Sequence, residues 1–189
     1  MSTIEIIKII KTKKLELRMK EFNIDLALQM HHNIQASIAE LNPYLEWSYK
    51  INTLEDVMEY LISLKSQTSI EDLISYGIFL RDCYIGQITL KCKDVMSKKY
   101  ELTYWISTNH AGQGYLTESA MALEKVAFKD YKVNKIEIIA DTGNIASNKV
   151  IQKLEYTLEG VLREDKFSMY YKTYRDVNTY AKLAKNYQK

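Results

Sequence analysis

The sequence predicts an α/β domain in which a mixed β-sheet carries helices on both faces. Segments in which apolar and polar residues alternate indicate half-buried strands, and segments with apolar residues three or four apart indicate amphipathic helices. The two kinds of segment are interspersed along the chain, as in domains that pack helices on a sheet. The 189 residues include one proline and six glycines, with no linker or repeat. Residues 1–189 are therefore expected to form one domain.

The N-terminal part is predicted to contain two strands followed by two helices. The strands are expected at 4–10 and 15–19, on either side of a lysine-rich turn. The first helix is expected over 23–40, where apolar residues recur four apart. The second is expected over 53–65, where the initial threonine and Asp56 form the pattern of a capping box.

A β-hairpin is predicted next, with strands near 76–80 and 84–90 and a polar turn between them. The alternation places Tyr84, Ile88 and Leu90 on one face of the second strand.

The remaining elements alternate between strand and helix before a final pair of strands. They are expected at 100–107 (strand), from Gly112 and Gly114, which introduce it, to about 128 (helix), and at 136–140 (strand), 144–154 (helix), 157–164 (strand) and 168–181 (strand). The complete order is β-β-α-α-β-β-β-α-β-α-β-β, which is typical of an α/β sheet covered on both sides.

Composition excludes several classes of function. A formal net charge of +2 argues against nucleic-acid binding through bulk charge, which needs a clustered basic face. Cys83 and Cys92 are too few for a disulfide framework or a zinc site, and the three histidines have no metal-ligand spacing. No apolar stretch reaches the roughly 20 residues of a membrane span. The protein is therefore expected to be soluble and cytoplasmic, with no metal.

The most informative segment is the glycine-containing stretch 109–118, which lies between a predicted strand and a predicted helix. Glycines allow the backbone to approach a ligand closely, and the free N–H groups at a helix start favour an anion such as a pyrophosphate. Taken alone, Gly112-x-Gly114 is equally consistent with a plain turn. A dinucleotide fingerprint would need a third glycine at Thr117, and no Gly-Lys-Ser/Thr of a Walker loop is present.

Several motifs, in order along nearly the whole chain, resemble one family. They are Leu41-x-x-Tyr44-Leu45-Glu46-Trp47, Glu101-Leu-Thr-Tyr-Trp-Ile106, Asn109-x-x-Gly112-x-Gly114, Gly114-Tyr-Leu-Thr-Glu-Ser119, Asn144-Ile-Ala-Ser147 with Lys153-Leu154, Leu158-Glu-Gly-Val-Leu-Arg163 and Tyr174-Arg-Asp176. Together they resemble the GNAT superfamily of acyl-CoA N-acyltransferases, in particular the RimJ/RimL-like enzymes that acetylate the N-termini of ribosomal proteins. Two departures are Asn109, where the family has Gln or Arg, and Glu155, where it has a glycine that commonly takes the left-handed conformation.

The resemblance implies the GNAT fold, with a mixed, mostly antiparallel sheet that splays between the family's strands four and five, and with a bulge in strand four. It implies acetyl-CoA as cosubstrate and no metal. The residues that would contact acetyl-CoA are Trp105, Ile106 and Ser107 at the pantetheine arm, Gly112, Gln113, Gly114, Tyr115, Leu116 and Thr117 at the pyrophosphate, and Asn144, Asn148 and Lys153 elsewhere.

The resemblance and the chemistry of acetyl transfer also indicate catalytic residues. Ser147 is the candidate donor to the departing thiolate, although a helical serine also commonly bonds its own backbone. Glu101 is a candidate base that takes the amine's proton, although a strand carboxylate is more often a surface group. Tyr44 and Trp47 are candidate acceptor-site residues, with packing over the first helices as the alternative.

The acceptor is expected to be the N-terminal amine of a protein. A small amine (a polyamine, an antibiotic or an aminoacyl-nucleotide) and a non-catalytic acetyl-CoA-binding module remain as alternatives, because fold alone does not settle function. No nucleic-acid or membrane partner is expected, and a homodimer is an expectation from the resemblance.

Overall fold

The computed structural model describes residues 5–19 and 23–187. The strands are β1 (Ile9–Lys11), β2 (Leu15–Met19), β3 (Leu73–Leu80), β4 (Cys83–Asp94), β5 (Lys99–Ile106), β6 (Lys135–Asp141), β7 (Thr157–Ser168) and β8 (Thr173–Leu183). The α-helices are α1 (Ile24–Gln35), α2 (Ile38–Leu41), α3 (Leu54–Ser66), α4 (Tyr115–Lys129) and α5 (Ile145–Lys153). Short 3₁₀ turns lie at Glu46–Lys50, Thr108–His110 and Ala184–Asn186.

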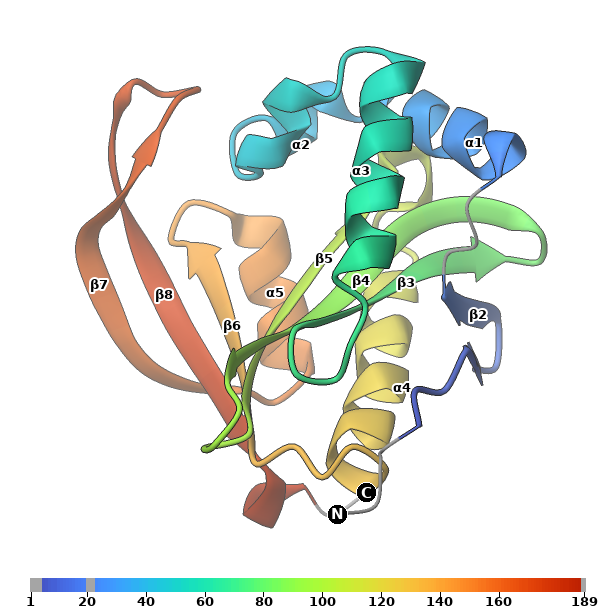
Figure 1. Ribbon diagram of the computed structural model, residues 1–189. Coiled ribbons are helices and arrows are strands. Elements are labelled where there is room, and N and C mark those ends of the chain that lie inside the picture. Colours follow the sequence, from blue (N-terminus) through green and yellow to red (C-terminus); the bar gives the residue numbers. More distant parts are fainter. Residues whose placement is uncertain (1–4, 20–22, 188–189) are drawn as a thin grey trace.

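The eight strands form one sheet in the order β1-β2-β3-β4-β5-β6-β8-β7. Every neighbouring pair is antiparallel except β5 and β6, which are parallel. Helices α1 and α3 cover one face of the sheet and α4 and α5 cover the other (Figure 1). Each pair of helices packs on its own buried apolar cluster, so the predicted mixed sheet with helices on both faces is confirmed.

Strands β5 and β6 separate after a short parallel contact. They pair only from Lys99 to Glu101 and from Lys135 to Glu137. Beyond this point β5 continues beside β4 to Ile106, while β6 continues beside β8 to Asp141. The splay implied by the family resemblance is therefore present, and it leaves one edge of β5 without a strand partner.

The predicted helix 23–40 is interrupted, because Ser37 bonds to a distant loop. Helix α1 ends at Gln35 and α2 begins at Ile38. The buried Ser37 hydroxyl accepts a hydrogen bond of 2.9 Å from the backbone N–H of Thr108, just after β5. The bend thus ties the first helices to the loop that follows the splayed strand. The predicted first strand, 4–10, is also shorter, since β1 spans only Ile9–Lys11 and residue 4 lies outside the described residues.

The predicted face of Tyr84 is wrong, because β4 contains a bulge. The register with β3 shifts from Ile78↔Gly86 to Phe79↔Tyr84, which leaves Ile85 as an extra residue. Tyr84 therefore packs with Phe79 in the cluster under α1 and α3, while Ile88 and Leu90 lie in the other cluster.

The family resemblance also implied a bulge in strand four, which is β5 in this chain. No such bulge is found at the splayed end of β5, because β5 pairs with β4 in unbroken register from Leu102 to Ile106.

Glu155, which replaces the family's glycine after α5, takes the left-handed conformation with φ of 59°. This conformation is costly for residues with a Cβ and natural for glycine. We expect Glu155→Gly to raise the free energy of unfolding by about 0.5–1 kcal/mol, and the melting temperature by about 2 °C, in a thermal scan. Glu59→Gly, at an exposed position inside α3, is the matched control and should destabilise by about 1 kcal/mol. Equal losses in both variants would contradict the strain at Glu155.

Candidate active site

The loop between β5 and α4 presents backbone N–H groups to solvent. Gly112 and Gly114 have φ of 74° and 81°, and α4 begins immediately afterwards. Gly114 is the N-cap and supplies no side-chain acceptor to the first helical turn. A Cβ at either glycine would meet nothing within 4 Å, so the backbone conformation, rather than lack of space, explains the glycines.

No hydrogen bond from the N–H groups of 112–117 to another described residue is present. These groups lie at the positive end of the α4 dipole and so form a cradle for an anion. Gln113 makes only a 3.5 Å contact from its amide to the Asn109 carbonyl. The segment that sequence reasoning singled out therefore has the backbone geometry of an anion site.

Tyr104 of β5 and Ser147 of α5 meet where β5 and β6 separate. Their hydroxyl oxygens are 3.2 Å apart. Sequence reasoning chose Ser147 but missed Tyr104, which lies beside the chosen Trp105. The available signal was the alternation of β5, which places Tyr104 on the same face as Leu102 and Ile106. The contact with α5 itself joins residues 43 positions apart.

Either hydroxyl of this pair can be the donor. Burial raises the pKa of Tyr104 to about 12, so its phenol keeps its proton at physiological pH. Tyr104 can therefore donate this proton to Oγ of Ser147. A serine hydroxyl has one proton and two lone pairs. Donation from Tyr104 therefore leaves the Ser147 proton free for a ligand.

The N-terminus of α5 is fixed by two asparagines. Oδ1 of Asn144 accepts from the Ser147 N–H at 3.0 Å and caps the helix. The buried Asn148 amide donates to the carbonyls of Asp141 and Asn144, and its Oδ1 accepts from Asn178 and Tyr180 of β8. All four hydrogen-bonding capacities of Asn148 are thus used within the protein. Its predicted contact with acetyl-CoA has no free polar atom to support it.

The turn before α5 is fixed by hydrogen bonds from β8 and from the segment that follows α2. Asp141 accepts a bidentate pair of bonds from Arg175 at 2.9 and 3.0 Å, and a further bond from the Gly143 N–H. Burial raises the pKa of Asp141, but the bonds from Arg175 and Gly143 outweigh it and place the pKa below its ordinary value. From the other side, the Tyr44 hydroxyl donates to the Gly143 carbonyl at 3.2 Å.

The two predicted acceptor-site aromatics have different surroundings. Tyr44 is half-buried and contacts the turn next to Asn144. Trp47 stacks on Tyr60 with ring centres 5.9 Å apart and lies 5.8 Å from Trp105. The structure therefore brings Tyr44 to the site, whereas Trp47 belongs largely to the packing beneath α3.

Glu101 is not brought together with Ser147. Its carboxylate forms a 3.0 Å ion pair with Lys93 of β4. It lies on the face of β5 that also carries Trp105, opposite to the face that meets α5. A base acts on the acceptor amine rather than on Ser147, so the role of Glu101 as base stays a prediction.

The other predicted cofactor contacts divide into two groups. At the end of β5, the Trp105 indole nitrogen and the Ser107 hydroxyl are buried with no hydrogen-bond partner among the described residues, while Ile106 is half-buried. Lys153 lies at the opposite end of α5 from Ser147, roughly 9 Å along the helix axis, on the wall of a hollow that also contains Met121 and Tyr187. The structure thus separates Lys153 from the reacting end of the site.

The chain belongs to the acetyltransferase (GNAT) domain family, whose model matches residues 17–157. A putative ribosomal N-acetyltransferase (YdaF) of Bacillus subtilis is 30% identical over 91 residues, 48% of this chain and 50% of that protein. A ribosomal-protein-serine acetyltransferase of Escherichia coli is 30% identical over 108 residues, 57% of this chain and 59% of that protein. The matches therefore span about half the length of these curated relatives.

Solved structures support the same fold at lower identity. RimL, a ribosomal L7/L12 α-N-protein acetyltransferase in complex with coenzyme A, superposes with a TM-score of 0.87 at 23% identity, covering 95% of this chain and 99% of that one. The microcin C7 self-immunity acetyltransferase MccE, in complex with acetyl-CoA and AMP, gives a TM-score of 0.82 at 20% identity, covering 90% and 93%. Within the described residues, no helix has the length and apolar character to cross a membrane, and no cluster of three metal-ligating side chains occurs.

Proposed function

We propose that this protein transfers an acetyl group from acetyl-CoA to the N-terminal amine of a protein. The observation that carries this proposal is the Tyr104–Ser147 hydroxyl pair, which lies at the splay of β5 and β6. The anion cradle at 112–117 follows the same strand β5. A donor for a leaving group and a site for its phosphates thus belong to one continuous feature of the fold. The family and both curated relatives point to the same reaction.

The chain's residues fit acetyl-CoA in three places. The N–H groups of 112–117 would bind the pyrophosphate. The unpaired edge of β5, at Trp105, Ile106 and Ser107, would pair with the amides of the pantetheine arm as an added strand does. When bound, acetyl-CoA supplies an activated acetyl group on a thiol that must leave. With Tyr104 as the donor in their pair, Ser147 would donate a hydrogen bond to the sulfur as negative charge develops there.

The amine must be neutral before it can attack. An α-amino group has a pKa near 8 and is partly neutral at pH 7–8, whereas a lysine side chain or a polyamine has a pKa above about 10. A site whose candidate base, Glu101, is paired with Lys93 on the far face of β5 suits the more easily deprotonated amine. This comparison favours a protein N-terminus over a small aliphatic amine.

The proposal is tested by mass spectrometry of acceptors incubated with acetyl-CoA and the purified protein. The panel contains peptides with free and with blocked N-termini, a polyamine, and an aminoacyl-nucleotide. Detection of the acetylated product is preferable to detection of free thiol, because Cys83 is exposed and unpaired and would react with thiol reagents. Acetylation only of free peptide N-termini supports the proposal. Acetylation only of small amines would replace it by the second function, and binding of acetyl-CoA without any product would favour the non-catalytic module.

Removal of the Tyr104 hydroxyl should slow the reaction without weakening cosubstrate binding. We expect Tyr104→Phe to lower kcat about tenfold, since Ser147 loses the donor that orients it, and to leave the KM for acetyl-CoA within about twofold. Because the pKa of Tyr104 is about 12, the pH–rate profile below pH 10 should keep its shape. Tyr104→Phe added to Ser147→Ala should cost nothing further in a double-mutant cycle. Additive losses would show that Tyr104 acts independently of Ser147.

Two finer properties also remain proposals. The two unpaired cysteines, Cys83 and Cys92, suit a reducing compartment such as the cytoplasm.

Homodimer formation is supported by apolar side chains that are exposed on the β7–β8 hairpin, among them Val161, Phe167 and Tyr174. Light scattering coupled to size-exclusion chromatography would test the oligomeric state.

A further inference from the structure

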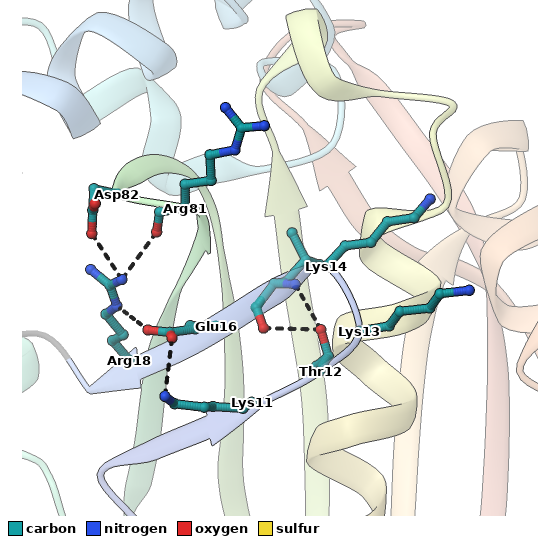
Figure 2. Close-up of a pocket in the computed structure, with 9 residues that line it drawn as sticks. Lys11, Thr12, Lys13, Lys14, Glu16, Arg18, Arg81 and Asp82 are labelled. Atoms are coloured by element: carbon teal, nitrogen blue, oxygen red, sulfur yellow. Dashed lines mark hydrogen bonds and ion pairs between the residues drawn. The ribbon is translucent and has the colours of Figure 1, made fainter.

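A basic hollow lies beside the anion cradle. Its volume is about 350 Å³, and its walls come from the β1–β2 turn, β2 and the β3–β4 turn. Five cationic side chains line it against two carboxylates, as Figure 2 shows: Lys11, Lys13, Lys14, Arg18 and Arg81 against Glu16 and Asp82. None of these residues was singled out by the sequence motifs.

Two of the five cations are already neutralised by the two carboxylates. Arg18 donates to Glu16 at 2.8 Å and to Asp82 at 3.1 Å, and Lys11 lies 3.6 Å from Glu16. Arg18 also donates to the Arg81 carbonyl at 3.0 Å, which fixes the β3–β4 turn. This cluster is a structural ion-pair network that shapes the wall of the hollow.

The other three cations have no acidic partner among the described residues: Lys13, Lys14 and Arg81. All three are exposed. In Figure 2 the side chains of Lys13 and Lys14 extend toward the yellow ribbon that contains the start of α4, and the Arg81 guanidinium points away from Asp82. The hollow therefore presents uncompensated positive charge, which favours an anionic ligand.

The β1–β2 turn is fastened to the first turn of α4. One carboxylate oxygen of Glu118 accepts from the Thr12 hydroxyl at 2.6 Å and from the Lys14 backbone N–H at 2.8 Å. The Lys14 ammonium lies 6.0 Å from the centre of the Tyr115 ring, on the first residue of α4. Glu118 therefore places the free lysines next to the N–H groups that receive the pyrophosphate.

We propose that this hollow binds the 3′-phosphate of the acetyl-CoA nucleotide. The inference rests on the proposed function, which places the pyrophosphate on the α4 N-terminus. CoA carries a third phosphate, a monoester with up to two negative charges, separated from the pyrophosphate by a single ribose. Lys13 and Lys14 supply compact positive charges, and Arg81 supplies a guanidinium fork that can bind a phosphate through two hydrogen bonds.

Calorimetric titration of the whole protein with CoA and with 3′-dephospho-CoA tests the inference without any turnover. The unaltered protein should bind CoA roughly tenfold more tightly than 3′-dephospho-CoA, since each exposed ion pair contributes up to about fivefold. The triple variant Lys13→Gln/Lys14→Gln/Arg81→Gln should lose this preference and bind both ligands with similar affinity. The preference of the unaltered protein should also shrink between about 0.05 M and about 0.5 M salt.

A charge-matched control separates local contacts from the overall field. Lys65→Gln/Lys129→Gln/Arg163→Gln removes three exposed cations outside the hollow and should keep the preference for CoA. The inference is overturned if the first triple variant weakens binding of both ligands by the same factor, or of neither. Failure of the unaltered protein to bind either ligand would overturn the proposed function together with it.

Discussion

Ser147→Ala is expected to lower kcat by about 10²–10³, the range lost when one positioned hydrogen-bond donor is removed. The leaving thiolate would then lose the donor that we propose for it. The KM for acetyl-CoA should stay within about twofold, since the proposed pyrophosphate cradle and the proposed pantetheine edge of β5 are untouched. Steady-state kinetics on the best acceptor of the panel measure both constants.

Ser63→Ala, at an exposed position on α3, is the matched control and should leave both constants unchanged. Ser147→Ala should also keep its melting temperature within about 2 °C, because the helix cap uses the Ser147 backbone N–H and not its hydroxyl. A kcat within threefold of the unaltered protein would assign the donor role to another group. A matching rise in KM would instead indicate that Ser147 serves cosubstrate binding.

Local features of this chain could be predicted from the sequence because their causes are local. The capping box of Thr53 and Asp56 forms as predicted, with both of its hydrogen bonds. The left-handed Glu155 is likewise the residue where the motif has lost its glycine. In each case a few neighbouring residues determine the backbone conformation.

The site itself depends on contacts between residues far apart in the chain. The hydrogen bond between Ser37 and Thr108, where the first helix is interrupted, joins positions 71 apart. The residues around Ser37 show no local pattern that predicts this bond. Asn148 is enclosed by partners from β8, so its motif position alone suggested a ligand contact that its surroundings do not support. The ion pair of Glu101 depends likewise on sheet pairing, since β5 lies beside β4 and brings Glu101 next to Lys93.

The spacing between β4 and β5 depends on the absence of a side chain at Gly86, which pairs with Ile106 at the end of β5. A Cβ at this position would overlap the Trp105 carbonyl oxygen and would lie 2.9 Å from Cα of Ile106. Both are backbone atoms in a paired strand, so neither can move aside by a rotamer change. A side chain at Gly86 would have to push apart β4 and the part of β5 that is proposed to hold the pantetheine arm.

Gly86→Ala should therefore lower the free energy of unfolding by about 3 kcal/mol, and the melting temperature by roughly 6–10 °C, in a thermal scan. The folded fraction should also bind acetyl-CoA at least tenfold more weakly, because the edge of β5 is displaced. Gly160→Ala in β7 is the matched control: an added Cβ there meets nothing within 4 Å, so stability should stay equal or rise slightly. An unchanged melting temperature for Gly86→Ala would mean that β5 can shift at little cost, and its edge could not then serve as a rigid template for the cosubstrate.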